Sequence, residues 1–387
     1  MNFDNTQVAF ASKTNKDLKR ANLLFSSMAI PWLTRIGIQA TLWSLRVGIP
    51  IRGIIKQTIF NHFCGGETLQ EAQQTAEALN QYGISVIMDY GVEGKSSEEE
   101  FEKAVESFLT TIRFVADKPN IPFVSLKVTG FADFNLLEKV HSGELLSTSE
   151  IQAFERVRQR IHRICKEAAE QGKMILIDAE ESWIQQPVDD LADALMAEFN
   201  KNNVVVFNTF QLYRHDRLEF LKASFQKAKA EGYHLGAKLV RGAYMEKERE
   251  RALAMGYTSP IQANKSDTDR DFDLGVKFCL QNLNNLHLFI GTHNEKSCLD
   301  AVAIMEQLGI SKQHHSVHFS QLYGMSDNIS FNLSQEGYQV SKYLPYGPVG
   351  DVIPYLMRRA QENTSVAGQT GRELSLIRKE LERRKKS

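Results

Sequence analysis

Eight short apolar runs after residue 83 dominate the pattern of hydrophobic and polar positions along the chain. Within the first six runs Val, Ile, Leu or Phe occupy consecutive positions. The runs span residues 84–91, 121–128, 173–180, 203–213, 234–244, 286–294, 315–324 and 338–347. Strands that are apolar at consecutive positions are buried on both faces, so the pattern predicts eight interior strands.

Helix-length amphipathic segments separate these runs. Two of them open with a capping signal, Ser97 with Glu100 and Ser147 with Glu150. Buried strands that alternate with helices indicate a parallel sheet, and eight such units over residues 84–363 predict an α/β fold of the (β/α)8 TIM-barrel type. An open doubly wound sheet is the alternative, but no G-x-G-x-x-G follows the first run and no G-x-x-x-x-G-K-[ST] occurs.

The same pattern divides the chain into three parts. We expect an N-terminal helical arm over residues 1–83, the barrel over 84–363 and a basic C-terminal helix or tail over 364–387. Residues 21–56 are unusually apolar, which fits either helices packed on the barrel or an element on a membrane surface. No uncharged run reaches the roughly 20 residues needed to span a bilayer.

Composition and charge narrow the function. The chain has 387 residues, of which 42% are hydrophobic and 24% charged, with a net charge of -1. This charge balance argues against a nucleic-acid partner. The four cysteines lie far apart and are expected to be free thiols in a reducing compartment. His314, His315 and His318 have no carboxylate at ligand spacing, so no metal site is expected.

Polar residues gather where the apolar runs end. In a barrel the active site lies at the C-terminal ends of the strands, so these side chains are expected to meet at one rim. They are Asp89, Tyr90, Lys127, Asp178, Glu180, Gln211, Lys238, Arg241, Tyr244, Thr292, His293, Asn294, Gln321 and Tyr343. When Arg358 and Arg359, which follow the eighth run, are counted with them, cations outnumber carboxylates, which predicts a small anionic substrate or cofactor.

A helix is predicted after the eighth run, with Asp351 as its N-cap and Pro354 in its first turn. It places Tyr355, Arg358, Arg359 and Glu362 on one face. On local grounds this face is solvated, with Arg358 and Glu362 paired. Its position after strand eight favours instead a clamp for a carboxylate or phosphate.

Five motifs in order resemble the proline dehydrogenase family. They are "LIDAEE" (176–181), "FNTFQLY" (207–213), "AKLVRGAY" (237–244), "GTHN" (291–294) and "YLPYGPV…PYLMRRAQEN" (343–363), and the similarity begins at "NHFCGGET" (61–68). The resemblance implies a (β/α)8 barrel with its eighth helix over the barrel mouth and a noncovalent FAD. It also implies oxidation of L-proline to Δ1-pyrroline-5-carboxylate, with electrons passed to a membrane quinone.

The resemblance also carries residue roles onto this sequence. The catalytic positions are Asp178, Lys238 and Tyr343. The substrate-binding positions are Lys127, Arg358 and Arg359 for the carboxylate, with Leu239, Tyr244 and Tyr355 near the ring. The cofactor-binding positions are Ala179, Gln211, Lys238, Arg241, Gly242, Ala243, Thr292, His293, Asn294 and Glu362. Many bacterial members have Arg at position 238 and Lys at 241, so the two charges are exchanged here.

Three alternatives stay open at this stage. Hydroxyproline dehydrogenases tend to carry Ser where this chain has Tyr343, and a tyrosine would crowd a ring hydroxyl. A Schiff-base aldolase would use Lys127. A barrel that binds without catalysis is the third.

The partners and location follow from the same resemblance. A separate pyrroline-5-carboxylate dehydrogenase is expected downstream. The tail over residues 372–387 is either a solvated helix end or a peripheral contact with anionic lipid. The expected location is the cytoplasm with peripheral inner-membrane contact in a bacterium, or the matrix side of the mitochondrion in a eukaryote.

Overall fold

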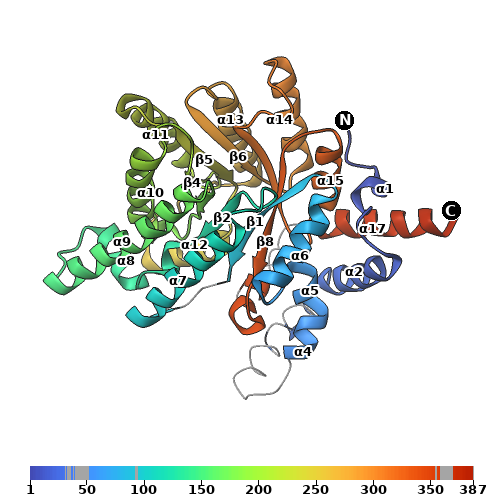
Figure 1. Cartoon of the computed structure of the whole chain (residues 1–387), viewed down its shortest axis with the longest axis horizontal. Coiled ribbons are helices and arrows are strands. Elements are labelled where there is room, and N and C mark those ends of the chain that lie inside the picture. The colour runs from blue at the N-terminus through green and yellow to red at the C-terminus, as the bar shows by residue number, and fades with distance from the viewer. Residues whose placement is uncertain are drawn as a thin grey trace. The chain divides into compact units, whose positions relative to one another are not determined.

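The computed structural model describes residues 1–30, 32, 36–37, 39, 52–91, 95–353, 355–357 and 369–386. Within these residues eight parallel strands close into a barrel in chain order, which confirms the predicted (β/α)8 fold (Figure 1). The strands are β1 (Ile84–Tyr90), β2 (Phe123–Leu126), β3 (Met174–Ile177), β4 (Val206–Gln211), β5 (Leu235–Val240), β6 (Leu286–Gly291), β7 (Val317–Leu322) and β8 (Val340–Tyr346).

Each strand lies inside one of the predicted apolar runs and is shorter than it. Most of the polar residues that closed those runs therefore lie on the loops just beyond the strand ends, as with Lys127 after β2 and Asp178 after β3. Leaving the strand frees these side chains from the in-and-out alternation of the sheet.

The helices of the barrel lie between the strands. They are α7 (Glu98–Val115), α8 (Phe134–Ser142), α9 (Thr148–Glu170), α10 (Gln185–Phe199), α11 (Arg217–Glu231), α12 (Met245–Met255), α13 (Lys265–Leu280), α14 (Glu295–Gln307) and α15 (Asp327–Gln335), with short 3-10 turns η2 (Val128–Gly130) and η3 (Ser182–Ile184). Both predicted capping boxes are present, at Ser97 with Glu100 and at Ser147 with Glu150.

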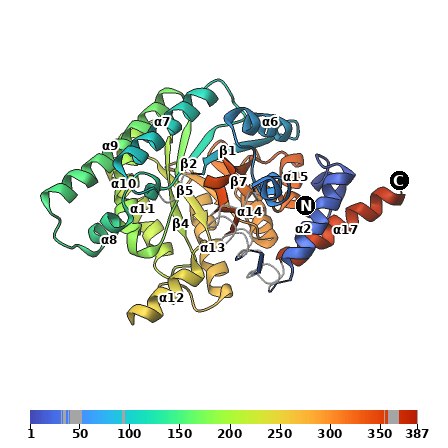
Figure 2. The ribbon, with the colours of Figure 1, turned by 90° about the horizontal axis from the view of Figure 1, so that it is seen from below.

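The described part of the N-terminal arm is helical, as predicted. It contains α1 (Thr6–Ala9), α2 (Asn15–Met28), α4 (Arg52–Ile55), the π-helical turn η1 (Lys56–Phe60), α5 (Asn61–Phe63) and α6 (Leu69–Asn80). The C-terminal helix α17 (Gln369–Lys386) lies beside α2 in both views (Figure 1, Figure 2). None of the described helices is long and apolar enough to cross a membrane.

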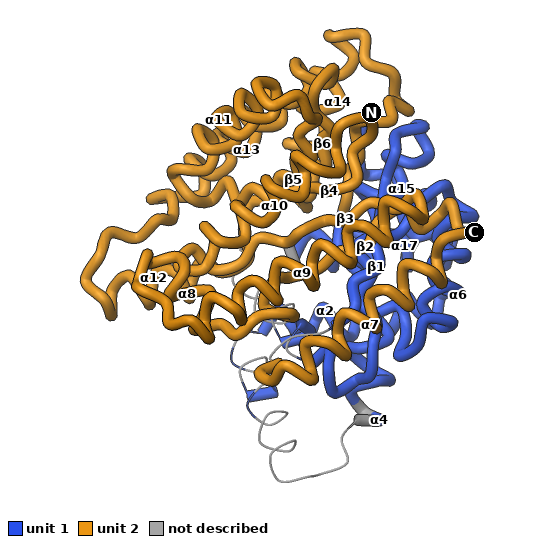
Figure 3. The backbone as a smooth tube through the Cα atoms, turned by 60° about the vertical axis from the view of Figure 1, so that its left-hand side comes forward, with its two compact units in different colours: residues 1–91, 321–387 blue, residues 92–320 orange. Residues whose placement is uncertain are grey.

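The chain separates into two compact units (Figure 3). The first contains residues 1–91 and 321–387, so it holds the arm, β1, β8 and α17. The second contains residues 92–320, with β2 to β6 and most of β7. The three-part boundaries expected from the sequence stay a prediction.

Each unit has its own core. In the second, Phe123, Phe207 and Phe289 come from the alternate strands β2, β4 and β6, and their rings meet edge to face. Filling by alternate strands is the usual interior of this barrel. In the first, Phe25 of α2 and Leu376 of α17 belong to one cluster of buried apolar side chains.

The four cysteines are free, as the sequence predicted, and all four are buried. Burial raises the pKa of each thiol, so these groups stay protonated at neutral pH.

A buried histidine in the barrel core makes stability depend on pH. His318 stacks on Phe289 and meets Phe123 edge to face, and burial lowers its pKa to about 4. As the pH falls below the unfolded-state value near 6.5, the unfolded chain takes up a proton that the folded chain does not. Folding stability is therefore lost between pH 6.5 and 4, by about 3 kcal/mol for this group.

We expect His318→Phe to flatten this dependence. Denaturant unfolding from pH 7 to 4 should show a smaller slope for the variant than for the parent protein. His162→Gln is the control, because the His162 side chain is 40% exposed and lies outside the core, and it should keep the parent slope. Equal slopes for His318→Phe and the parent would contradict the assignment.

Candidate active site

A buried ion pair lies at the carboxyl ends of β3 and β5. Asp178 directly follows β3, and Lys238 lies within β5. The Lys238 Nζ is 2.5 Å from Asp178 Oδ1, and both side chains are largely buried, at 8% and 12% exposure. An unpaired charge would be costly in such a buried place, and here each group has a partner of opposite charge. The structure thus brings together two of the three residues predicted to be catalytic.

Arg241 joins the ends of β5 and β6. Its guanidinium donates to Asp269 Oδ1 (2.8 Å), Thr292 Oγ1 (2.7 Å) and Ser297 Oγ (2.9 Å). It also lies over the ring of Phe272, 4.3 Å from the centroid. The predicted cofactor residues Arg241 and Thr292 are therefore in direct contact, and the guanidinium is fixed on several sides.

The backbone after Arg241 runs close to an aromatic ring. Gly242 has φ +138°, and a Cβ there would lie 2.4 Å from the ring of Tyr213. The next residue, Ala243, is exposed, and α12 begins two residues later at Met245. Only glycine fits this close approach. Because Gly242 and Ala243 are both exposed, their main chain is open to a ligand.

Glu180 links two further predicted positions. Its carboxylate accepts from the Thr129 N–H (3.1 Å) and the Thr129 hydroxyl (2.5 Å), two residues after Lys127. Its main-chain carbonyl accepts from Gln211 Nε2 (2.7 Å). Burial raises the pKa of Glu180 to about 7, an effect that Thr129 and Lys127 oppose.

Other predicted residues of this unit have simpler surroundings. Leu239 and Ala179 are buried, and Lys127, Tyr244 and His293 are half-buried. Asn294 caps α14, because its Oδ1 accepts from the Ser297 N–H at 3.2 Å. The structure thus gives Asn294 a capping role, and its predicted cofactor contact stays a prediction.

The first unit carries the remaining predicted residues. Tyr343 lies on β8 opposite Ile87 of β1 and is buried at 8% exposure. Tyr355 is buried in the same cluster as Val352 and Leu356. Arg358, Arg359 and Glu362 lie outside the described residues, so their roles stay predictions.

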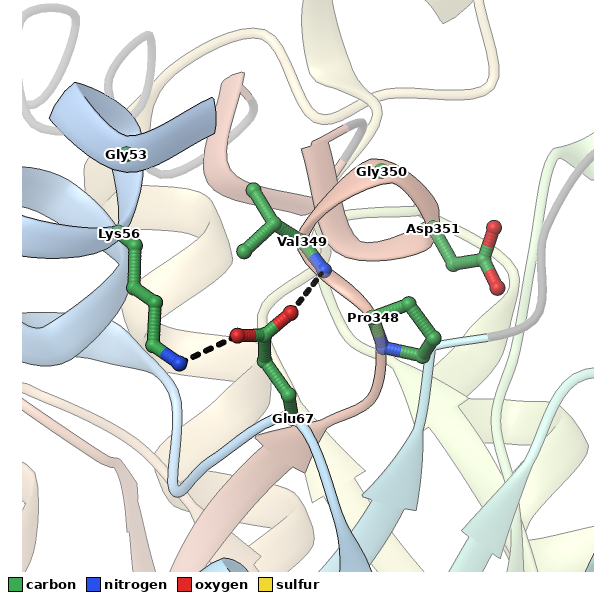
Figure 4. Close-up of a pocket in the computed structure, with 7 residues that line it drawn as sticks. All are labelled: Gly53, Lys56, Glu67, Pro348, Val349, Gly350 and Asp351. Carbon is green, nitrogen blue, oxygen red and sulfur yellow. Dashed lines mark hydrogen bonds and ion pairs between the residues drawn. The ribbon is translucent and has the colours of Figure 1, made fainter. Parts of the chain in front are cut away.

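A small pocket of about 240 Å³ lies beside the start of the helix that follows β8 (Figure 4). It is lined by Gly53, Lys56, Glu67, Pro348, Val349, Gly350 and Asp351. None of the predicted catalytic, substrate or cofactor residues lines it. We therefore interpret it as a feature of the helix start.

Glu67 closes that helix start from a distant part of the chain. Its Oε2 accepts from the Val349 N–H at 3.4 Å, and its Oε1 pairs with the Lys56 ammonium (Figure 4). The helix begins at Val349, two residues before the predicted N-cap Asp351, so that prediction was wrong. A carboxylate at a helix N-terminus is favourable, and here a different segment supplies it.

Among the described residues, no group of three His, Cys, Asp or Glu side chains could hold a metal ion. The contacts of Arg241 with Asp269 and Ser297 had no signal in the sequence, because neither residue ends an apolar run. Glu180 did have such a signal, two positions after Asp178, and it was predicted to lie at the rim, although no catalytic, substrate-binding or cofactor-binding role was predicted for it.

Fold and site together define a class of protein. A closed (β/α)8 barrel with a buried ion pair and other polar side chains at its C-terminal strand ends is the architecture of a barrel enzyme. A family model described as proline dehydrogenase matches residues 72–372.

Several relatives also match most of the chain. The carbapenem antibiotics biosynthesis protein CarD of Pectobacterium carotovorum is 35% identical over 83% of each chain. The mitochondrial proline dehydrogenase 1 of Arabidopsis thaliana is 31% identical, covering 97% of this chain and 85% of that protein. The hydroxyproline dehydrogenase of Xenopus laevis is 32% identical over 97% of this chain and 88% of its own.

A solved structure supports the fold. Proline utilization A from Bdellovibrio bacteriovorus superposes with a TM-score of 0.74 at 20% identity, covering 97% of this chain and 39% of that one. The chain belongs to the proline dehydrogenase family, and it is an oxidoreductase. This membership confirms the resemblance seen in the sequence. It argues against the two alternatives of another class, a Schiff-base aldolase and a barrel that binds without catalysis.

Proposed function

We propose that this protein oxidises L-proline to Δ1-pyrroline-5-carboxylate with a noncovalently bound FAD and passes the electrons to a quinone. The observation that carries the proposal is the buried pair of Lys238 and Asp178, in a chain of the proline dehydrogenase family. Within this pair, Asp178 holds the positively charged Lys238 ammonium in a fixed place near the strand ends. Such a charge favours a cofactor that becomes an anion when reduced.

The donors present fit FAD. Lys238 and Arg241 are cations, Thr292 offers a hydroxyl group, and the main chain at Gly242 and Ala243 is open. A flavin diphosphate and the carbonyl edge of a flavin ring both accept hydrogen bonds, which matches this set. In the proposal these residues, with Gln211 and His293, hold the cofactor.

The chain's own residues prepare proline for oxidation. FAD supplies the hydride acceptor when it is bound. Lys127 binds the substrate carboxylate together with Arg358 and Arg359, so one end of the ring is clamped. Tyr244, Tyr343 and Tyr355 pack the ring and exclude water. The surrounding cations lower the pKa of the proline ammonium, which favours the neutral amine that gives up a hydride.

Substrate choice tests the proposal against its nearest alternative. One relative is a hydroxyproline dehydrogenase, so a hydroxylated ring is the competing substrate. Tyr343 is buried on β8, and a bulky side chain there leaves less room for a ring hydroxyl. We expect kcat/KM with a soluble quinone to be higher for L-proline than for trans-4-hydroxyproline. The reverse order would assign the protein to the hydroxylated substrate.

A membrane quinone calls for a surface that meets lipid, and α2 offers one. Its outward face carries Lys16, Lys19 and Arg20 near the N-terminal end and the apolar Leu23 near the middle, with Leu23 73% exposed. Ile30 and Trp32, which follow α2 in the chain, are apolar and exposed too. Cations beside exposed apolar side chains are typical of a helix that lies in the interface of an anionic membrane.

The tail contributes less to this surface than its charge suggested. Arg384 donates to the main-chain carbonyls of Phe10 and Lys13, and Arg383 and Arg384 both pair with Glu380. Arg384 thus fastens α17 to the arm, whereas Arg383 pairs within α17. Arg378, which contacts Asn22 of α2, remains exposed beside the proposed lipid face.

We expect Leu23→Glu to weaken binding to vesicles containing anionic lipid by roughly tenfold, because it places a carboxylate at the apolar part of that face. Turnover with a soluble quinone should not change. Leu253→Glu is the matched control, since Leu253 is 87% exposed on α12. If both variants bind vesicles as the parent does in a sedimentation assay at low salt, this face does not meet the membrane.

A further inference from the structure

Glu180 is a buried carboxyl group to which the proposed chemistry gives no task. Its side chain is 3% exposed. It lies within a run of three residues after β3 that begins with Asp178. A buried carboxylate is costly unless several donors satisfy it, so its partners indicate what it holds.

Those partners lead to the substrate-binding lysine. Both donors of Thr129 point at the two carboxylate oxygens. Thr129 is the middle residue of η2, and Lys127 is the N-cap of that turn. The Lys127 carbonyl accepts from the Gly130 N–H at 3.0 Å, so Lys127 and Thr129 belong to one tight turn. The Lys127 ammonium also acts electrostatically on Glu180.

The main chain of Glu180 contacts Gln211, a residue predicted to bind the cofactor. Its carbonyl holds Gln211, and its N–H donates to Gln185 Oε1 at 2.8 Å. Gln185 in turn donates to Asp189, which pairs with Arg217 at 2.6 Å. The position of Glu180 is therefore fixed by a buried network, and a rigid support of this kind orients the groups attached to it.

We propose that Glu180 is a positioning residue that holds the Lys127 turn, and with it the substrate-carboxylate lysine, in register with Gln211 on the cofactor side. This inference rests on the proposed function. A displaced pKa from burial beside a specific charged partner is common at functional sites and agrees with it.

The substitutions separate the side chain from the main chain of Glu180. Glu180→Ala removes the bonds to Thr129 but keeps the carbonyl that holds Gln211. Glu180→Gln keeps the shape, can accept from the Thr129 N–H and can donate to its hydroxyl group. Glu181→Gln is the matched control, because the neighbouring Glu181 is equally buried but pairs with Lys247 instead.

The test is carried out on the flavin-loaded protein with two ligands. One is L-proline, and the other is cyclopentanecarboxylate, which keeps the carboxylate but lacks the reacting nitrogen. We expect Glu180→Ala to raise the KM for proline and the Kd for cyclopentanecarboxylate by roughly tenfold, the size of one lost charge-assisted contact. Flavin content and kcat should change by less than about twofold, and Glu180→Gln should recover most of the affinity.

Two outcomes would overturn the inference. One is a Glu180→Ala variant with the same KM and Kd as the Glu181→Gln control. The other is a fall in kcat with unchanged KM, which would place Glu180 in the chemical step. If proline does not reduce the flavin of the parent protein, the proposed function is refuted instead. The failure of the inference and the failure of the proposed function are therefore distinguishable.

Discussion

Lys238→Met is expected to slow proline-dependent flavin reduction by about 10² to 10³-fold, the usual cost of removing one fixed group that stabilises a developing charge. Lys238 is 8% exposed, and its ammonium is held by Asp178. Methionine keeps the length and apolar character of the side chain and removes only the charge. The measurement is the anaerobic rate of flavin bleaching after rapid mixing with proline.

The same change leaves the Asp178 carboxylate buried without its cation, which is expected to cost roughly 3–5 kcal/mol of stability. The double variant Asp178→Asn, Lys238→Met removes both charges and should recover stability while flavin reduction stays slow. Lys247→Met is the control, because Lys247 pairs with Glu181 and its side chain is 57% exposed. Parent rates in Lys238→Met would contradict the assigned role.

Arg358→Met and Arg359→Met are each expected to raise the KM for proline by about 10²-fold, because a forked pair of charge-assisted hydrogen bonds to a carboxylate contributes roughly 3 kcal/mol. The bound FAD should be retained. Arg372→Met is the control, since Arg372 pairs with the exposed Asp4. Steady-state kinetics and the flavin content of each purified variant provide the measurement.

Loss of FAD from either arginine variant, with little change in KM, would mean that this helix face binds the cofactor. An unchanged KM together with full flavin content would mean that Arg358 and Arg359 bind neither ligand. They would then belong to a solvated helix face, as the local sequence alone indicates. Both results can be read from the same preparations.

The barrel could be predicted from the sequence because its strands are buried on both faces. A run such as residues 203–213 is apolar along most of its length, and β4 lies within it. Local helix starts were equally visible, since Ser147 and Glu150 cap α9 from within the same four residues. Structures that depend only on neighbouring residues can therefore be predicted directly from the sequence.

Contacts between distant segments could not be predicted in the same way. Glu67 caps the N-terminus of the helix after β8 and lies 282 positions before Val349, so the local sequence predicts Asp351 as the cap instead. Arg241 was expected to face a cofactor, and its partners Asp269 and Ser297 appear only in the fold. The position of a residue just after a predicted strand indicates that its side chain reaches the rim. It does not indicate which contacts hold that side chain in place.

The central claim is tested most directly by adding L-proline to the purified protein without oxygen. We predict a yellow protein whose bound flavin loses its visible absorption on addition of proline and regains it on addition of a quinone. The variant Lys238→Met serves as the matched sample and should bleach far more slowly. A protein that takes up no FAD would contradict the account. So would a bound flavin that stays oxidised after proline is added.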